Sequence, residues 1–125
     1  MQTISEKVTY GYEFDDVEIS LADFNVRKAG AARKITPRSF EVLLYLVRNQ
    51  GRVVEKQELF EQIWRENFVS DNALTRVVRE IRQVIGDDAA APRYIETVPK
   101  RGYRFIAEVE KLERQNDGFK PVDIV

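Results

Sequence analysis

The sequence contains neither cysteine nor histidine. Without cysteine, disulfides and thiolate metal sites are excluded. Without histidine, a Ser-His-Asp or Cys-His catalytic arrangement cannot form, and the commonest metal ligand is missing. The adjacent carboxylates Asp15-Asp16 and Asp87-Asp88 lie in stretches typical of turns or strand edges, so we interpret them as solvated turn residues rather than general acids or bases. We therefore expect no enzyme, no catalytic residues, no metal and no cofactor.

Long apolar runs are also missing. No stretch approaches the roughly 20 apolar residues that cross a bilayer, and the N-terminus MQTISEKVTY lacks the charged and then apolar pattern of a signal peptide. The 125 residues, 43% of them hydrophobic, are enough for one domain with a core. We expect a soluble, cytoplasmic domain with no membrane segment in this chain.

The chain carries no net positive charge; its formal net charge is -1. The sign is nevertheless unevenly distributed along the chain. Residues 27–52 hold seven Lys or Arg against one Asp or Glu, and residues 72–107 hold seven against four, whereas residues 1–26 hold one against six. Local positive charge of this kind is compatible with binding to nucleic acid.

The pattern of apolar residues predicts strands followed by helices. Short alternating runs from Tyr12 to Ile35 indicate a small antiparallel sheet. Beyond it, Thr36 before a proline and Ser70 before an aspartate are typical helix caps. We predict a first helix at residues 37–49, a short second helix within residues 55–64, a break at about residues 65–69, and a third helix at residues 71–85.

A hairpin is predicted at residues 94–107, where two runs of β-branched and aromatic residues flank the turn Pro99-Lys100-Arg101-Gly102. Its tip carries two adjacent cations, and we expect Gly102 to supply a positive φ. Residues 1–11 are interpreted as a flexible N-terminus. The polar residues 110–125 are interpreted as an irregular tail or a linker to a domain absent from this chain.

The short helix and the longer one after it form a helix-turn-helix pattern. Rotation by about 100° per residue places Leu74, Val78, Ile81 and Ile85 together on a core face of the third helix. Opposite them lie Asn72, Arg76, Arg79 and Gln83, with Thr75 and Glu80 on the flanks and Arg82 near the core border. Arginine can bond guanine and asparagine or glutamine adenine, so this face is a candidate for reading DNA. The alternative is an ordinary solvated helix face, just as the hairpin tip could be charged only for solubility.

Several blocks agree in order and spacing with a known family: TPRSFEVLLYLV, LFEQIW, VSDNALTRVVREIRQVIGDD and TVPKRGYRF. Residues 35–109 resemble the OmpR/PhoB-type winged helix-turn-helix, and particularly its ToxR/CadC-like members. The resemblance implies an α+β winged helix-turn-helix domain at residues 12–109. Its parts are an N-terminal antiparallel sheet at 12–35, three helices at 37–85 and a wing hairpin at 94–107.

The resemblance also implies roles for individual residues. The recognition helix enters the major groove, which places Asn72, Thr75, Arg76, Arg79 and Glu80 at or near bases and phosphates. Lys56 and Trp64 match backbone-contacting positions of the second helix, although Trp64 could equally be a core aromatic. Lys100 and Arg101 match the wing, which borders the minor groove. Some relatives have arginine where this chain has Pro99.

The resulting hypothesis is sequence-specific binding of double-stranded DNA by the effector domain of a transcriptional regulator. A second copy on tandem half-sites, and RNA polymerase at the RENFVS connection, are further partners that the resemblance leaves open. No receiver domain precedes the winged helix, so we expect a sensor or membrane segment downstream, as in ToxR/CadC-like proteins. The alternative hypothesis is a protein-protein interaction module without DNA binding, which the net charge and Glu80 favour.

Overall fold

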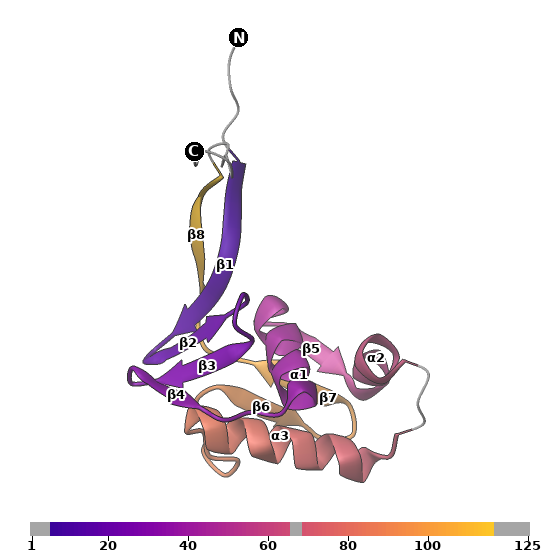
Figure 1. Cartoon of the computed structure of the whole chain (residues 1–125). Coiled ribbons are helices and arrows are strands. Elements are labelled where there is room, and N and C mark those ends of the chain that lie inside the picture. Colours follow the sequence, from indigo (N-terminus) through magenta and orange to yellow (C-terminus); the bar gives the residue numbers. More distant parts are fainter. Residues whose placement is uncertain (1–5, 66–68, 117–125) are drawn as a thin grey trace, which may run out of the picture.

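The computed structural model describes residues 6–65 and 69–116 (Figure 1). The elements in chain order are β1 (Glu6–Phe14), β2 (Val17–Ser20), β3 (Asn25–Lys28), β4 (Ala31–Arg33), α1 (Pro37–Arg48), β5 (Val53–Glu55), α2 (Lys56–Leu59), the π-helical turn η1 (Phe60–Trp64), α3 (Asp71–Ile85), β6 (Ile95–Val98), β7 (Gly102–Phe105) and β8 (Glu110–Asn116). This order confirms the predicted fold class, with an antiparallel sheet, then helices, then a hairpin. No helix of the described ranges is long and apolar enough to span a bilayer.

Two antiparallel sheets pack against the helices. The first has the strand order β4-β3-β2-β1-β8, and the second has the order β5-β7-β6. In Figure 1, β1 and β8 extend together away from the body, and α3 lies along the opposite side of the molecule. The second sheet joins the hairpin to the strand between α1 and α2, which is how the wing is attached to the helical part.

Two sequence-based boundaries were wrong. Within the predicted flexible segment, β1 already begins at Glu6, and within the predicted irregular tail β8 spans Glu110–Asn116. The two strands pair antiparallel from Glu6 opposite Asn116 to Glu13 opposite Glu110. The polar sequence of β8 has no apolar face that would mark it as a strand, because its main stabilisation is backbone pairing with β1. Residues 1–5 and 117–125 lie outside the described ranges.

The predicted helix caps are confirmed. The Thr36 side chain accepts a hydrogen bond from Ser39 N at 3.3 Å, and Ser70 accepts one from Ala73 N at 3.3 Å. Gly86, at φ 78°, ends α3 in the left-handed conformation that glycine adopts without strain. Each cap stabilises its helix by about 1 kcal/mol.

The predicted second helix is present but not regular. One α-helical turn, α2, continues into η1, and Arg65 ends it at φ 48° with its N–H bonded to Phe60 O at 2.9 Å. Within α2, Glu58 accepts from Arg52 Nη2 at 2.8 Å and also from the Tyr45 hydroxyl. The Arg52 guanidinium is the main cause that holds the pKa of Glu58 down at about 2. This cluster ties the end of α1 to α2.

The core lies between the helices and the two sheets. Fully buried side chains include Leu43 and Leu46 of α1 and Ile81 of α3, each worth roughly 1.5–3 kcal/mol of stabilisation. Phe105 of β7 and Tyr94 stack at 6.5 Å between ring centroids. Burial, followed by the hydrogen bond from the Tyr94 hydroxyl to Asp15 at 2.6 Å, raises the pKa of Tyr94 to about 12. The base of the wing is thereby fixed to the first sheet.

Candidate nucleic-acid interface

The faces of α3 are as the sequence predicts. Leu74, Val78, Ile81 and Ile85 are buried, and Asn72, Thr75, Arg76, Arg79 and Gln83 are exposed. Within the described ranges, neither Arg76 nor Arg79 forms an ion pair or a side-chain hydrogen bond. These two guanidinium groups are therefore available to an external partner.

The Glu80 side chain is bound within the domain, whereas the family resemblance placed it at or near bases and phosphates. Its Oε2 accepts from Thr36 N at 3.0 Å, and its Oε1 accepts from Thr36 Oγ1 at 3.2 Å and from Ser39 Oγ at 2.8 Å. The carboxylate thus lies at the N-terminus of α1, where negative charge suits the helix dipole. The reason for the correction is that the flank position of Glu80 faces α1 rather than solvent. Its negative charge is used inside the domain, which weakens the argument for a purely protein-binding surface.

Arg82 connects the recognition helix to the wing. Its Nη2 donates to Ile95 O at 2.8 Å and to Thr97 Oγ1 at 3.1 Å, while its Nε lies 3.8 Å from Asp87 Oδ2. The position at the core border that the sequence predicts is therefore a bridge from α3 to β6. This side chain thus braces α3 against the first strand of the wing.

Asp87 is not a solvated turn residue, contrary to the sequence-based interpretation. Its side chain is fully buried. It accepts hydrogen bonds from three successive backbone N–H groups, those of Arg93 at 2.8 Å, Tyr94 at 3.2 Å and Ile95 at 2.9 Å. The buried charge is satisfied by these donors and by Arg82, and it directs the chain into β6. Asp88 is exposed, as predicted.

The wing tip is a three-residue connection between β6 and β7. Arg101 N donates to Val98 O at 3.0 Å, and the positive φ, 67°, occurs at Lys100. The prediction that Gly102 supplies the positive φ was wrong. Glycine is needed there for another reason, since a Cβ at Gly102 would lie 2.0 Å from Val54 O of the neighbouring strand.

The two cations of the tip differ in their surroundings. Lys100 is exposed, and no ion pair involves it in the described part of the chain. Arg101 forms an ion pair with Glu55 at 2.6 Å, which raises the pKa of the Arg101 guanidinium. Both partners are exposed, so a phosphate could compete with Glu55 at little cost.

Lys56 and Trp64 also differ from each other. Lys56 Nζ lies 3.2 Å from Asp71 Oδ2, so it joins the start of α2 to the start of α3. Trp64 is 9% exposed and belongs to the hydrophobic core, with Phe60 at 6.0 Å and the Arg38 guanidinium 5.0 Å from the ring centroid. The structure thus favours the core alternative for Trp64, because its ring fills the space between α1 and η1.

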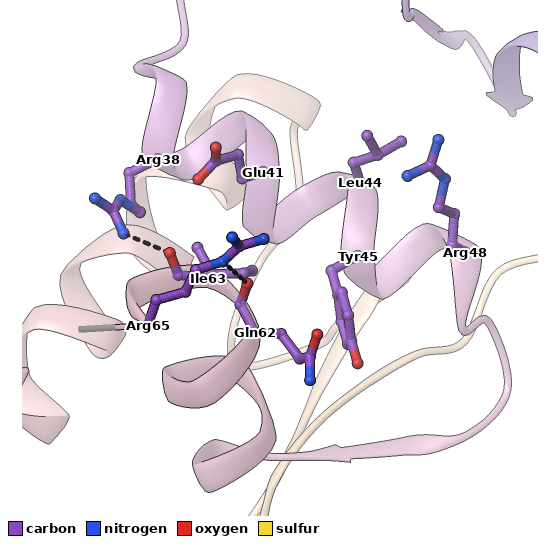
Figure 2. A pocket seen from close by; sticks show the side chains of 8 residues that line it. All are labelled: Arg38, Glu41, Leu44, Tyr45, Arg48, Gln62, Ile63 and Arg65. Atoms are coloured by element: carbon purple, nitrogen blue, oxygen red, sulfur yellow. Dashed lines mark hydrogen bonds between the residues drawn. The ribbon is translucent and has the colours of Figure 1, made fainter. Parts of the chain in front are cut away.

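A basic hollow of about 510 Å³ between α1 and η1 was missed by the sequence reasoning (Figure 2). Arg38 Nη1 donates to Ile63 O at 3.0 Å, and Arg65 Nε donates to Gln62 O at 3.3 Å. The remaining lining residues are Glu41, Leu44, Tyr45 and Arg48. Helical spacing of the α1 residues could have shown that they share a face, but the opposing wall depends on the irregular turn η1.

The family model described as "Transcriptional regulatory protein, C terminal" matches residues 30–105. The chain belongs to this family. That membership confirms the OmpR/PhoB-type resemblance predicted from the motif blocks. The matched region includes all the helices and the wing hairpin.

Relatives and solved structures of the transcriptional regulatory family agree with this assignment. The cholera toxin homolog transcriptional activator of Vibrio parahaemolyticus is 30% identical over 115 residues, which cover 90% of this chain and 39% of that protein. Transcriptional activator CadC of Escherichia coli is 31% identical over 85 residues, which cover 67% of this chain and 17% of that protein. The chain therefore spans well under half the length of these relatives.

The fold recurs in solved structures of the same type. Response regulator DrrB, a Thermotoga maritima OmpR/PhoB homolog, has a TM-score of 0.72 and 37% identity over 78% of this chain and 44% of that chain. The DNA-binding domain of Klebsiella pneumoniae RstA, solved in complex with the RstA box, has a TM-score of 0.70 and 21% identity over 77% of this chain and 96% of that chain. The latter identity is low enough that it shows the fold alone.

Proposed function

We propose that the chain is the DNA-binding effector domain of a transcriptional regulator and binds double-stranded DNA in a sequence-specific way. The observation that carries this proposal is the outer face of α3, where Arg76 and Arg79 are exposed and without partners in the described ranges. An isolated basic helix face is common, but this one is fixed beside a cationic wing by Arg82. The family of the chain, described as "Transcriptional regulatory protein, C terminal", supports the same conclusion.

In this proposal α3 occupies the major groove. Asn72, Thr75, Arg76 and Arg79, from the start to the middle of the helix, face base edges and phosphates. Gln83, about one turn later on the same exposed face, is a further candidate contact. Each bidentate contact between an arginine and a guanine would discriminate against the wrong base by about 1–3 kcal/mol. Glu80 is left out of the proposed contacts because α1 holds its carboxylate.

The wing adds contacts to the backbone or the adjacent minor groove through Lys100 and Arg101. Lys56 lies close enough to the start of α3 to contact a phosphate, if it exchanges Asp71 for that phosphate. Trp64 would act indirectly, by holding η1 against α1.

Other aspects of the function stay predictions. The family and the relatives are transcriptional regulators, and we infer that the chain has no enzymatic activity of its own. We also infer that it acts in the cytoplasm, within a longer protein that could be tethered to a membrane. Of the connection predicted to contact RNA polymerase, residues 66–68 lie outside the described ranges. Binding of a second copy on tandem half-sites is likewise untested.

The experiment begins with selection of binding sites from random duplex DNA, followed by fluorescence anisotropy on the selected duplex and on a scrambled one across a salt series. We expect log affinity to fall linearly with log salt. Arg76→Ala should cost about 1–3 kcal/mol on the selected duplex and relax base preference at one position. Arg27→Ala on β3, an exposed arginine outside both α3 and the wing, is the matched control. Absence of salt-dependent binding to any duplex would favour the protein-interaction module instead.

A further inference from the structure

The β1–β8 ribbon extends beyond the rest of the first sheet. Strand β2 pairs with β1 only from Gly11 to Phe14, whereas β8 pairs with β1 from Glu6 to Glu13. The outer half of the ribbon therefore consists of two strands alone, as Figure 1 shows. A two-stranded ribbon is marginally stable in water, so this segment would gain from additional strands.

One long edge of this ribbon is free. Strand β8 is the last strand of the sheet, and no strand of the described ranges pairs with its outer side. Its seven residues leave a row of backbone N–H and C=O groups available for pairing. The opposite edge of the sheet, β4, has only three residues. The ribbon's other side, residues 6–9 of β1, likewise has no second partner strand in the described ranges, but it is shorter than β8.

The charges along β8 have no ionic partner among the residues that the structure describes. Glu110, Lys111, Glu113 and Arg114 are all exposed, and none forms an ion pair with another described residue. Arg114 only lies over the Tyr10 ring, with its Cζ 5.8 Å from the centroid. Four charged groups on seven residues normally protect an edge strand from pairing with unlike strands.

The same charges are complementary to themselves. If a second copy of β8 pairs antiparallel with Leu112 opposite Leu112, then Glu110 lies opposite Arg114 of the second copy, and Lys111 lies opposite Glu113 of the second copy. Side chains that are directly opposite share a face of the sheet, so each pair of charges meets.

We propose that β8 pairs edge to edge with β8 of a second copy and so forms a symmetric dimer through one continuous sheet. Each copy presents the same strand, as a two-fold interface requires. Because α3 lies on the side of the body away from the ribbon, the candidate DNA-binding surfaces stay open in this dimer. The proposal is independent of DNA binding and is tested without DNA.

The register can be tested by cross-linking, because the chain has no cysteine of its own. Leu112→Cys places one thiol directly opposite its counterpart, within the Cα separation of roughly 4.4–6.8 Å that a disulfide needs. Gln115→Cys on the same strand is the matched control, since the two thiols would be about 20 Å apart in this register. Rapid disulfide dimers of Leu112→Cys, with few from Gln115→Cys, are expected under mild oxidation. Equal cross-linking of both variants would overturn the register.

Charge reversal tests the complementarity. Glu110→Lys/Glu113→Lys makes the charges of β8 all positive, and Lys111→Glu/Arg114→Glu makes them all negative. In sedimentation velocity, each variant alone should dimerise at least about tenfold more weakly than the unchanged chain. An equimolar mixture of the two variants should dimerise again, and Glu41→Lys/Glu61→Lys, away from the ribbon, should behave as the unchanged chain. A chain that stays monomeric at high concentration, or reversed variants that still dimerise alone, would overturn the proposal.

Discussion

Replacement of Glu80 separates its structural role from the DNA contact that the sequence suggests. Its carboxylate accepts three hydrogen bonds from Thr36 and Ser39, and Ser39 is fully buried. Hydrogen bonds to a charged group contribute about 1.5–3 kcal/mol, and a buried donor left without a partner costs about 1–3 kcal/mol. Glu80 is half-buried, so we expect Glu80→Ala to lower the free energy of unfolding by about 2 kcal/mol. Glu80→Gln, which keeps one accepting oxygen, should lower it by about 1 kcal/mol.

Urea denaturation measures these differences, with Glu61→Gln as the control for loss of an exposed carboxylate. The control should stay within about 0.5 kcal/mol of the unchanged chain. Binding-site selection with Glu80→Gln should return the same base preference as the unchanged chain. If Glu80→Gln instead leaves stability unaltered and changes the preferred base at one position, the carboxylate reads DNA and our account of α1 capping is refuted.

Three further predictions concern the wing and α2. Gly102→Ala should destabilise the domain by at least about 2 kcal/mol in thermal unfolding, because the new Cβ would meet Val54 O, and an unchanged melting temperature would contradict the close approach. Lys100→Gly should raise stability by about 1 kcal/mol by removing a positive φ from a non-glycine residue, yet reduce the salt slope of DNA binding by about 0.9, and an unchanged slope would remove Lys100 from the interface. The pKa of Glu58 is lowered from 4.5 to about 2, chiefly by its hydrogen bond from Arg52. The ionised Glu58 side chain therefore stabilises the fold fully above pH about 4.5, and this stabilisation is lost as the pH falls towards 2. Glu58→Gln should therefore destabilise the domain at pH 7 and much less at pH 2, as urea denaturation at the two pH values can show.

The sequence predicted those parts of the fold that depend on local patterns. The 3.6-residue period of α3 separates Leu74 and Ile81 from Arg76 and Arg79 correctly, and the cap residues mark where α1 and α3 begin. The hairpin and its cationic tip follow from β-forming runs on either side of a turn. In these elements the residues adjacent in the sequence determine the local structure.

The errors concern polar residues whose partners are distant in the sequence. Glu80 and Asp87 both look like solvent-exposed carboxylates, but their acceptors are directed to N–H and O–H groups of other segments. Strand β8 forms because β1 offers a partner about a hundred residues earlier in the chain. Glycine is required at position 102 because strand β5 passes close to it, and not because of the conformation of its own turn. Such pairings are set by tertiary packing and leave no local pattern.

The bridge made by Arg82 has a consequence for how DNA would be read. Because Arg82 and Asp87 hold α3 and the start of β6 together, they restrain the separation between the helix contacts and the wing contacts. A duplex that binds both must match that separation, and one whose grooves are spaced differently must bend or twist to do so. The energy of that deformation depends on base steps that no side chain touches. Arg82, which faces the protein and not the DNA, would then contribute to DNA-sequence preference by restraining the spacing between the two sets of contacts.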